Sequence, residues 1–210
     1  MTKVSAVLLA AGESRRMGEV NKLGLKVKGT PLLRRTAETL LASKLQEIVV
    51  VLGHEAEKAN AILEGLPLKF FYNKDYRDGQ MTSVYQGLSS LSQTCDGVMI
   101  CLSDQPLLQT DDVNVLIDAF GQLDHGCSHG SVLVPTYEGK RGHPIILDYQ
   151  HRQQILNGER NLGCKKLIEK NPELVSSFEM SNNHVVVDLD TPEEYAALSA
   201  GGSEAVALYK

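Results

Sequence analysis

The sequence has no long apolar run, and this absence excludes one class of protein. None of its hydrophobic stretches approaches the roughly 18 residues that a membrane-spanning helix requires. Residues 1–3 lead at once into a predicted strand and do not form the pattern of a signal peptide. We therefore expect a cytoplasmic protein with no membrane partner.

Positive charge is also scarce. The 210 residues carry a formal net charge of −5, whereas a nucleic-acid-binding domain is more often basic. We expect no nucleic-acid partner, and any nucleotide is expected to be held locally by a few positive groups.

Closely spaced cysteines are missing as well. The four cysteines, Cys95, Cys101, Cys127 and Cys164, form no C-x-x-C pair, and in a cytoplasmic protein they are expected to be reduced thiols. The segment 125–129 contains two histidines and a cysteine but has no fourth ligand at a recognised spacing, so a Gly- and Ser-containing loop is the preferred interpretation over a zinc site.

The length suits a single domain, which we place at residues 1–200, followed by a tail at 201–210. Short apolar runs predict strands at 4–10, 47–52, 68–72 and 97–102, and helical periodicity predicts helices at 32–43, 55–63 and 82–91, with a fourth helix capped by Thr110. Strands that alternate with helices indicate a mostly parallel sheet covered on both faces, which is an α/β three-layer sandwich.

The pattern loosens after residue 120. A strand is predicted at 131–135, and the stretch from 142 to 178 is interpreted as a small appended subdomain with short helices near 149–156 and 163–169. A last strand is predicted at 184–187. Residues 191–194, Thr-Pro-Glu-Glu, form a capping box that opens a terminal helix.

The loop that follows the first predicted strand contains Gly12, Gly18, Arg15, Arg16 and Lys22. It matches neither the P-loop nor the dinucleotide-binding fingerprint. Glycine lets a backbone N–H approach an anion closely, and the cationic side chains match phosphate oxygens. The loop therefore predicts a phosphate site; the alternative is a surface loop with solvated charges, and Arg15 fits that alternative better than Arg16 or Lys22.

Two acidic positions are candidates for a metal site. Asp104 follows the fourth predicted strand, at the same edge of the sheet as the glycine loop, and Mg²⁺ commonly joins one or two carboxylates to substrate phosphates. The alternative for Asp104 is a turn or capping residue. Asp188 and Asp190 flank the end of the last predicted strand; we favour Asp190, whose alternative role is a negative charge at a helix N-terminus.

Further candidates lie in two loops. Gly79, Thr82 and Ser83 open a predicted helix whose N-terminus attracts anions, although a plain helix cap is an equal interpretation. A lone histidine such as His143 is more often a packed or exposed residue than a ligand. Tyr72, Tyr76 and Tyr85 are interpreted as boundary packing rather than as a ligand stack.

The run Leu-Ala-Ala-Gly-x-Ser-x-Arg-Met-Gly at residues 9–18, followed by Lys22, resembles the signature of Rossmann-like nucleotidyltransferases, and most of all the molybdenum cofactor cytidylyltransferases. The resemblance continues through residues 29–37, 49–53, 79–83, 102–106, 141–144 and 188–193. Two stretches depart from the pattern: three residues instead of two separate Gly18 from Lys22, and residues 158–166 replace the usual Gly-Asp-x-Gly-Ala-Arg.

The resemblance implies a Mg²⁺-dependent enzyme that transfers CMP from CTP to the terminal phosphate of molybdopterin, with a molybdenum hydroxylase as a downstream recipient. It implies a Rossmann-like nucleotidyltransferase fold with a small C-terminal excursion. By this resemblance the catalytic residues are Arg16, Lys22 and Asp104; the nucleotide-binding residues are Leu9, Ala10, Ala11, Gly12, Arg16, Lys22, Gly79, Thr82 and Ser83; the acceptor-binding residues are Gly142, His143 and Pro144; and the metal ligands are Asp104 and Asp190.

Several alternatives stay open at this point. They are a guanylyltransferase, a sugar-phosphate nucleotidyltransferase, a nucleotide-sugar glycosyltransferase, and a non-catalytic accessory protein that carries the cofactor to a molybdenum hydroxylase. The resembling guanylyltransferases have glycine where Ala11 stands here, and the extra methyl group narrows the base pocket. A narrower pocket favours CTP over GTP.

Overall fold

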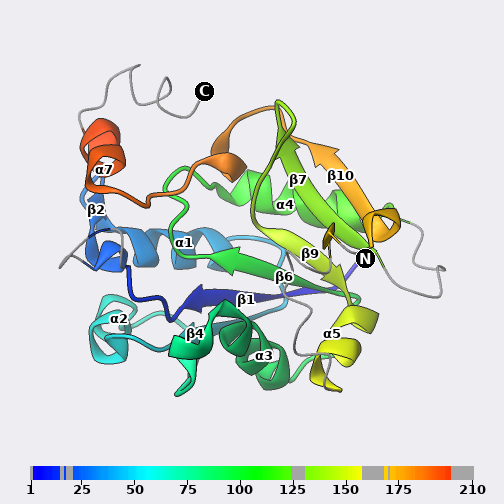
Figure 1. Ribbon diagram of the computed structural model, residues 1–210, viewed down its shortest axis with the longest axis horizontal. Helices are drawn as coiled ribbons and strands as arrows, with labels where there is room; N and C mark the ends of the chain where they lie inside the picture. The colour runs from blue at the N-terminus through cyan, green and yellow to red at the C-terminus, as the bar shows by residue number, and fades with distance from the viewer. Residues whose placement is uncertain are drawn as a thin grey trace.

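A computed structural model describes residues 2–14, 17, 21–123, 131–157, 168–169 and 171–199 (Figure 1). Arg15, Arg16 and Gly18, the histidine-containing loop at 125–129, residues 158–167 and the predicted tail at 201–210 lie outside the described residues. No helix of the described part has both the length and the apolar character that spanning a membrane demands.

One eight-stranded sheet forms the centre of the molecule, with the strand order β10-β7-β9-β6-β1-β4-β5 and β8 paired to β7. The strands are β1 (Val4–Ala10), β4 (Glu47–Leu52), β5 (Lys69–Tyr72), β6 (Gly97–Leu102), β7 (Val132–Tyr137), β8 (Lys140–Arg141), β9 (Ile145–Asp148) and β10 (Val175–Glu179). β1 pairs in parallel with β4 and β6, β4 with β5, and β10 with β7. The short strands β8 and β9 run antiparallel to their neighbours. The predicted mostly parallel sheet is confirmed.

The central strand β1 is buried along its whole length because both faces of the sheet are covered. Val4, Ala6 and Leu8 belong to the hydrophobic core on one face, whereas Val7 and Leu9 belong to the core on the other. Successive side chains of a strand point to opposite faces, so this alternation places one core on each side of the sheet. The three-layer α/β sandwich is therefore confirmed.

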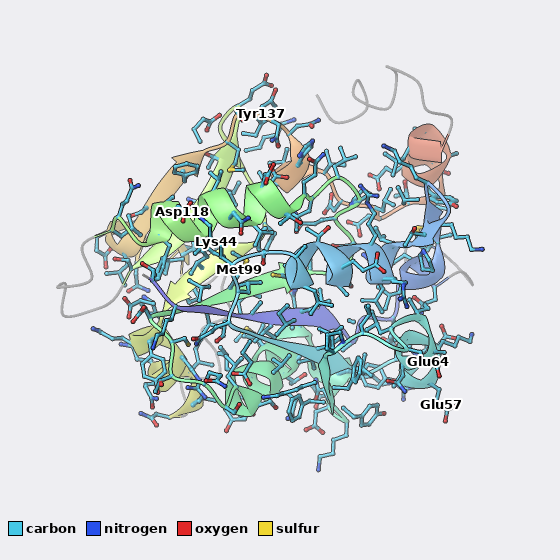
Figure 2. The ribbon with its side chains drawn as sticks, turned by 180° about the vertical axis from the view of Figure 1, so that it is seen from behind. Lys44, Glu57, Glu64, Met99, Asp118 and Tyr137 are labelled. Carbon is cyan, nitrogen blue, oxygen red and sulfur yellow. The ribbon has the colours of Figure 1, made fainter. Side chains whose placement is uncertain are left out.

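The helices divide between the two faces (Figure 1). α1 (Leu32–Leu41) and α4 (Thr110–Phe120) cover one face, and α3 (Gln80–Ser90) and α5 (Tyr149–Leu156) cover the other. α2 (Ala56–Ile62) lies beside α1. Figure 2 shows Lys44, just after α1, next to Asp118 of α4; Lys44 Nζ lies 2.7 Å from Asp118 Oδ2. Both side chains are substantially exposed, so this ion pair contributes little to stability.

Three details differ from the sequence-based expectations. The strands described within the stretch from 142 to 178 belong to the main sheet and not to an appended subdomain, because β9 pairs along β6 and joins β7 and β10 to that sheet. Residues 184–187 do not form a strand; His184–Val186 is a 3-10 turn, and the Val185 carbonyl is used by loop contacts from Gln105 and His143 instead of a strand partner. Gln109, rather than Thr110, is the residue that precedes α4 as its cap.

The C-terminal helix α7 (Pro192–Ser199) begins at the predicted capping box. Thr191 N–H donates to Glu194 Oε2 at 2.9 Å, and Glu194 N–H donates to Thr191 Oγ1 at 3.3 Å. Leu189, with Tyr195 and Leu198 of α7, packs against the β2–β3 hairpin (Lys26–Val27 and Thr30–Pro31) through Val27. This packing brings the segment that contains Asp190 next to the N-terminal loop.

Glu47, at the start of β4, carries a testable electrostatic contribution to stability. Burial alone raises the pKa of its carboxyl, but hydrogen bonds from Lys69, Ser92 and Gln93 outweigh burial and lower the pKa to about 2. A folded-state pKa below the unfolded value stabilises the protein above pH 4.5, and this stabilisation is lost as the pH falls toward 2.

Glu47→Gln is therefore expected to lower the free energy of unfolding at pH 7 by about 1–2 kcal/mol and to reduce the loss of stability between pH 4.5 and pH 3. Urea unfolding at pH 7 and pH 3 measures both effects. The matched control is Glu64→Gln, at an exposed position labelled in Figure 2, which should behave like the wild type. Equal pH dependence in the two variants would show that Glu47 has no special role.

Candidate functional site

The carboxyl ends of β1 and β6 meet at one edge of the sheet, because the two strands are parallel neighbours. The loops that leave them enclose a cavity of about 220 Å³. Its lining residues come from four parts of the chain: Leu9, Ala11, Gly12, Ser14, Lys22, Leu23, Tyr76, Gln80, Ser83, Leu102, Ser103 and Asp104. A cavity beyond the carboxyl ends of parallel strands is the usual location of a ligand in such folds. The predicted glycine loop and Asp104 therefore share one cavity.

A close backbone contact shapes this cavity. A Cβ atom on Gly53, at the end of β4, would lie 2.7 Å from Ala11 Cβ and 2.8 Å from Tyr76 Cβ, so only glycine permits this packing. His54 N–H also donates to the Ala11 carbonyl at 3.2 Å. The result is that Ala11 and Tyr76 both pack closely against Gly53, and both line the cavity.

Three charged side chains meet at one end of the cavity. Lys22 Nζ lies 2.5 Å from Asp104 Oδ2 and 3.1 Å from Asp190 Oδ1. The three side chains are only 14–16% exposed. The two carboxylates that the sequence predicted as metal ligands thus share one ammonium group, although they are 86 positions apart in the chain.

The electrostatics favour a positive charge at this point. Burial lowers the pKa of Lys22, but the charges and hydrogen bonds of Asp104 and Asp190 outweigh it, and the net pKa is raised above 10.5. Desolvation and the negative charges of Asp190 and Asp104 raise the pKa of the Asp188 carboxyl, even though Asp188 is partly exposed. The electrostatic environment of Asp104 and Asp190 is therefore strongly negative. Lys22, which contacts both, stays protonated at neutral pH.

The donor set fits a hard divalent cation. Asp104 Oδ1 is buried and has no hydrogen-bond partner among the described residues, which leaves a carboxylate oxygen available for an ion. Among all the residues that the structure describes, no group of three or more His, Cys, Asp or Glu side chains could hold a metal ion by itself. Two carboxylates beside the predicted phosphate-binding loop suit Mg²⁺, which usually completes its coordination with water and substrate oxygens.

The predicted acceptor loop lies next to Asp104. The Gln105 side-chain amide donates to the His143 carbonyl at 2.7 Å, and His143 N–H donates to the Val185 carbonyl at 2.8 Å. Desolvation lowers the pKa of His143, while the nearby Asp104 charge opposes this shift. His143 and Pro144 are joined by a cis peptide bond. The structure therefore places residues 142–144 beside the carboxylate end of the cavity.

The first turn of α3 forms another wall. Gly79 has φ +111°, a conformation that side-chain-bearing residues rarely adopt. Thr82 Oγ1 donates to the Gly79 carbonyl at 2.8 Å, and Asn73 Nδ2 donates to the hydroxyls of both Thr82 and Ser83. These hydroxyls hold the preceding loop instead of capping the helix in the ordinary way. Ser83 lines the cavity, whereas Thr82 lines a neighbouring hollow.

Sequence reasoning missed several cavity residues. Tyr76 was interpreted as boundary packing, but it lines the cavity and also contacts the His54 ring at a centroid distance of 6.2 Å. Gln80 also lines the cavity. The cavity is also lined by Ser14, Leu23 and Ser103. Their positions, in or next to the glycine loop or directly after a strand, could have indicated from the sequence that they line a ligand site. Ala10 is buried but does not line the cavity, and Arg16 lies outside the described residues.

Gly12→Val tests whether the glycine loop binds phosphate. A Cβ atom at Gly12 meets nothing within 4 Å, so the free protein should keep its melting temperature. A valine side chain in the cavity should lower nucleoside triphosphate affinity by about tenfold or more, measured by calorimetry, because steric clashes of this kind typically cost 1–3 kcal/mol. Gly24→Ala, where the new Cβ makes only ordinary contact, is the matched control. Equal affinity in both variants would exclude the loop from phosphate binding.

Comparisons with known proteins find relatives that match most of the chain. The chain is 29% identical over 194 residues to nicotine blue oxidoreductase of Paenarthrobacter nicotinovorans, with 91% of this chain and 94% of that protein covered. It is 30% identical to the purine catabolism protein PucB of Bacillus subtilis, with 90% and 92% covered. It is 31% identical to a probable molybdenum cofactor guanylyltransferase of Natronomonas pharaonis, with 94% and 90% covered.

Two solved structures share the fold. A homologue of Mycobacterium tuberculosis Rv0371c from Mycobacterium sp. strain JC1 has a TM-score of 0.76 at 25% identity, with 98% of each chain covered. Rv0371c of Mycobacterium tuberculosis H37Rv in complex with manganese has a TM-score of 0.72 at 20% identity, covering 96% of this chain and 100% of that one. The model of the MobA-like NTP transferase domain matches residues 6–175. The chain belongs to the MobA-like NTP transferase family, as its resemblance to the molybdenum cofactor nucleotidyltransferases predicted.

Proposed function

We propose that this nucleotidyltransferase transfers CMP from CTP to the terminal phosphate of a molybdopterin-type acceptor and releases pyrophosphate. The observation that carries the proposal is the contact of one protonated lysine, Lys22, with two carboxylates, Asp104 and Asp190, at the end of a cavity formed by a glycine loop. Such a site combines phosphate-binding and cation-binding groups, which phosphoryl chemistry needs more than it needs an acid or a base.

The similar proteins support the proposal in part. One relative is named a molybdenum cofactor guanylyltransferase, which suggests the acceptor class and a different nucleotide. One structure with the same fold holds manganese, which agrees with a divalent-cation site. Mg²⁺ is the ion we propose for the cell, and a molybdenum hydroxylase in the cytoplasm is the proposed recipient of the product.

In the proposed reaction an oxygen of the acceptor phosphate forms a bond to the α-phosphorus of CTP, and the bond from that phosphorus to the bridging oxygen of pyrophosphate breaks. In this scheme backbone N–H groups around Gly12 bind the triphosphate, and Arg16 has the role of neutralising the leaving pyrophosphate. Asp104 and Asp190 would hold Mg²⁺, which supplies charge neutralisation between the carboxylates and the phosphates. Leu9, Gly79 and Ser83 complete the nucleotide side, and residues 142–144 orient the acceptor phosphate.

Lys22 has two roles in this scheme. In the structure it neutralises Asp104 and Asp190, and in the proposed reaction its ammonium would contact the α-phosphate, while Asp104 and Asp190 would hold Mg²⁺. Burial lowers the pKa of Lys22, but its contacts with Asp104 and Asp190 outweigh burial and raise it, so Lys22 carries its charge at neutral pH while these contacts are made. The ammonium group of Lys22 would then stabilise the negative charge that develops on the phosphate oxygens in the transition state.

The choice of nucleotide is assigned to Ala11. Ala11 lines the cavity and its methyl group packs against Gly53; in the proposed complex this methyl group would reduce the space for a base. The wild type is expected to prefer CTP over GTP in kcat/KM, and Ala11→Gly should reduce this preference by roughly 10-fold or more without making GTP the better substrate. Steady-state rates with both nucleotides measure this; a wild-type preference for GTP contradicts the cytidylyl assignment, and an unchanged ratio in Ala11→Gly excludes Ala11 as its cause.

The central experiment measures pyrophosphate release for CTP, GTP, ATP and UTP, each with molybdopterin or a sugar phosphate as acceptor. Release that requires CTP and molybdopterin supports the proposal. Release with GTP or a sugar phosphate identifies another nucleotidyltransferase, and binding of the cofactor without release identifies a carrier. A parallel assay for reduction of a dye by NADH or NADPH tests the oxidoreductase activity that the name of one relative describes.

A further inference from the structure

Gln105 follows Asp104 directly but contacts different parts of the chain. The residue is 3% exposed, and its side-chain Nε2 donates to the His143 carbonyl at 2.7 Å and to the Val185 carbonyl at 3.1 Å. Both amide hydrogens are therefore used on backbone carbonyls from two separate segments. Turning the amide over would place Oε1 against both carbonyl oxygens, so its orientation is fixed by its partners.

The two segments that Gln105 joins are also in direct contact. His143 N–H donates to the Val185 carbonyl at 2.8 Å, and a Cβ atom on Gly142 would lie 2.3 Å from the same oxygen. Only glycine at position 142 permits this approach. The Val185 carbonyl is thus the point at which the acceptor loop, the 3-10 turn His184–Val186 and Gln105 converge.

The same arrangement extends to the second carboxylate. Leu189 N–H donates to the Asp104 carbonyl at 2.9 Å, so the residue before Asp190 is tied to the backbone of Asp104. On its other side Asp190 N–H donates to Glu194 Oε2 at 2.7 Å. The separation of the two carboxylates therefore depends on how the segment from Val185 to Asp190 is held against the loop that contains Asp104 and Gln105.

The hydrogen bonding of Gln105 is incomplete for a purely structural residue. Gln105 Oε1 is buried and has no hydrogen-bond partner in the part of the chain that the structure describes. Leaving a buried acceptor unpaired destabilises a folded protein, so such groups call for an explanation. A glutamine that tolerates this cost while joining the acceptor loop to the metal-ligand segment suggests a role beyond stability.

We propose that Gln105 is a positioning residue that sets the distance between Asp104 and Asp190 for a divalent cation and holds the loop 142–144 at the same cation. The inference rests on the proposed function, because it assigns a role within that site. Mg²⁺ requires ligand oxygens at about 2.0–2.1 Å, so small displacements of either carboxylate weaken binding. Gln105 acts through backbone carbonyls and does not itself contact the substrate.

The test compares Gln105→Met with Gln46→Met. Gln46 Nε2 makes a similar pair of hydrogen bonds, to Ser5 Oγ at 3.2 Å and to the Thr94 carbonyl at 2.8 Å, at the opposite edge of the sheet. Mn²⁺ binding in the presence of CTP is measured from the electron paramagnetic resonance signal of free Mn²⁺. Gln105→Met is expected to weaken Mn²⁺ binding and to raise the acceptor KM by about tenfold or more, with the CTP KM at saturating metal little changed. Gln46→Met should change none of these constants.

Unfolding free energies of both variants separate positioning from stability. If Gln105→Met loses stability but keeps the wild-type Mn²⁺ and acceptor constants, Gln105 is only structural and the inference is wrong. Gln105→Asn, which keeps the amide on a shorter side chain, serves if the methionine variant does not fold, and a smaller effect in the same direction is expected. If the wild type binds Mn²⁺ and Gln105→Met weakens this binding, but no nucleotide gives pyrophosphate release, the proposed function is wrong and the positioning role stands. If the wild type does not bind Mn²⁺ at all, both are wrong.

Discussion

Asp104→Asn is expected to lower the rate of pyrophosphate release by about 10² or more while the protein stays folded. The substitution keeps the shape of the side chain but removes a charge that lies 2.5 Å from Lys22 and that is proposed to hold the metal. Lys22 retains Asp190 as a partner, so the free protein should melt close to the wild-type temperature. Steady-state turnover at increasing Mg²⁺ and a thermal melt measure the two expectations.

Asp118→Asn is the matched control for this substitution. Asp118 also pairs with a lysine, Lys44, but on the exposed surface between the end of α1 and α4 (Figure 2). Turnover should be unchanged in the control. Wild-type turnover of Asp104→Asn at saturating Mg²⁺ would remove Asp104 from the site and with it the proposed mechanism.

The parallel half of the fold could be predicted because its strands leave a strong local signal. β1, β4 and β6 are buried on both faces, so they appear in the sequence as nearly continuous apolar runs between turn residues. The second half lacked this clarity because β9 joins the sheet antiparallel to both neighbours. This pairing depends on contacts between residues far apart in the sequence and on the edge of β6 that β1 leaves unpaired. A local sequence pattern contains neither kind of information.

The apolar run at 184–187 illustrates the same limit. Its valines predicted a strand, yet the Val185 carbonyl accepts hydrogen bonds from His143 and Gln105, which lie 42 and 80 positions earlier in the sequence. A backbone group that is used by two loops cannot also pair in a sheet. Propensity was overridden by tertiary contacts that no local pattern contains.

The part of the candidate site that directly follows strands could be predicted from the sequence. Asp104 follows β6, and the glycine loop follows β1, so their proximity follows from parallel pairing. The contact between Lys22 and Asp190 depends instead on the packing of Leu189 and Tyr195 against Val27. Tyr76 enters the cavity because Gly53 lets it approach Ala11, which is a property of packing and not of spacing.

Lys22→Met is expected to have two opposite effects. Pyrophosphate release should fall by about 10² or more, because a cation proposed to stabilise the transition state is lost. Mn²⁺ binding by the nucleotide-free protein should instead become several-fold tighter, because the ammonium that contacts Asp104 and Asp190 at 2.5 and 3.1 Å no longer competes with the metal. A residue that served only to stabilise the fold would not tighten metal binding when removed.

The measurement combines steady-state turnover with the electron paramagnetic resonance signal of free Mn²⁺. Lys44→Met, at the exposed pair with Asp118, should leave both quantities unchanged. The pKa of Lys22 is raised above 10.5, so its charge persists as the pH rises from 7 to 9 and the difference in Mn²⁺ affinity between wild type and Lys22→Met should persist as well. Unchanged or weaker Mn²⁺ binding in Lys22→Met would show that the lysine and the cation do not occupy the same position between the two carboxylates.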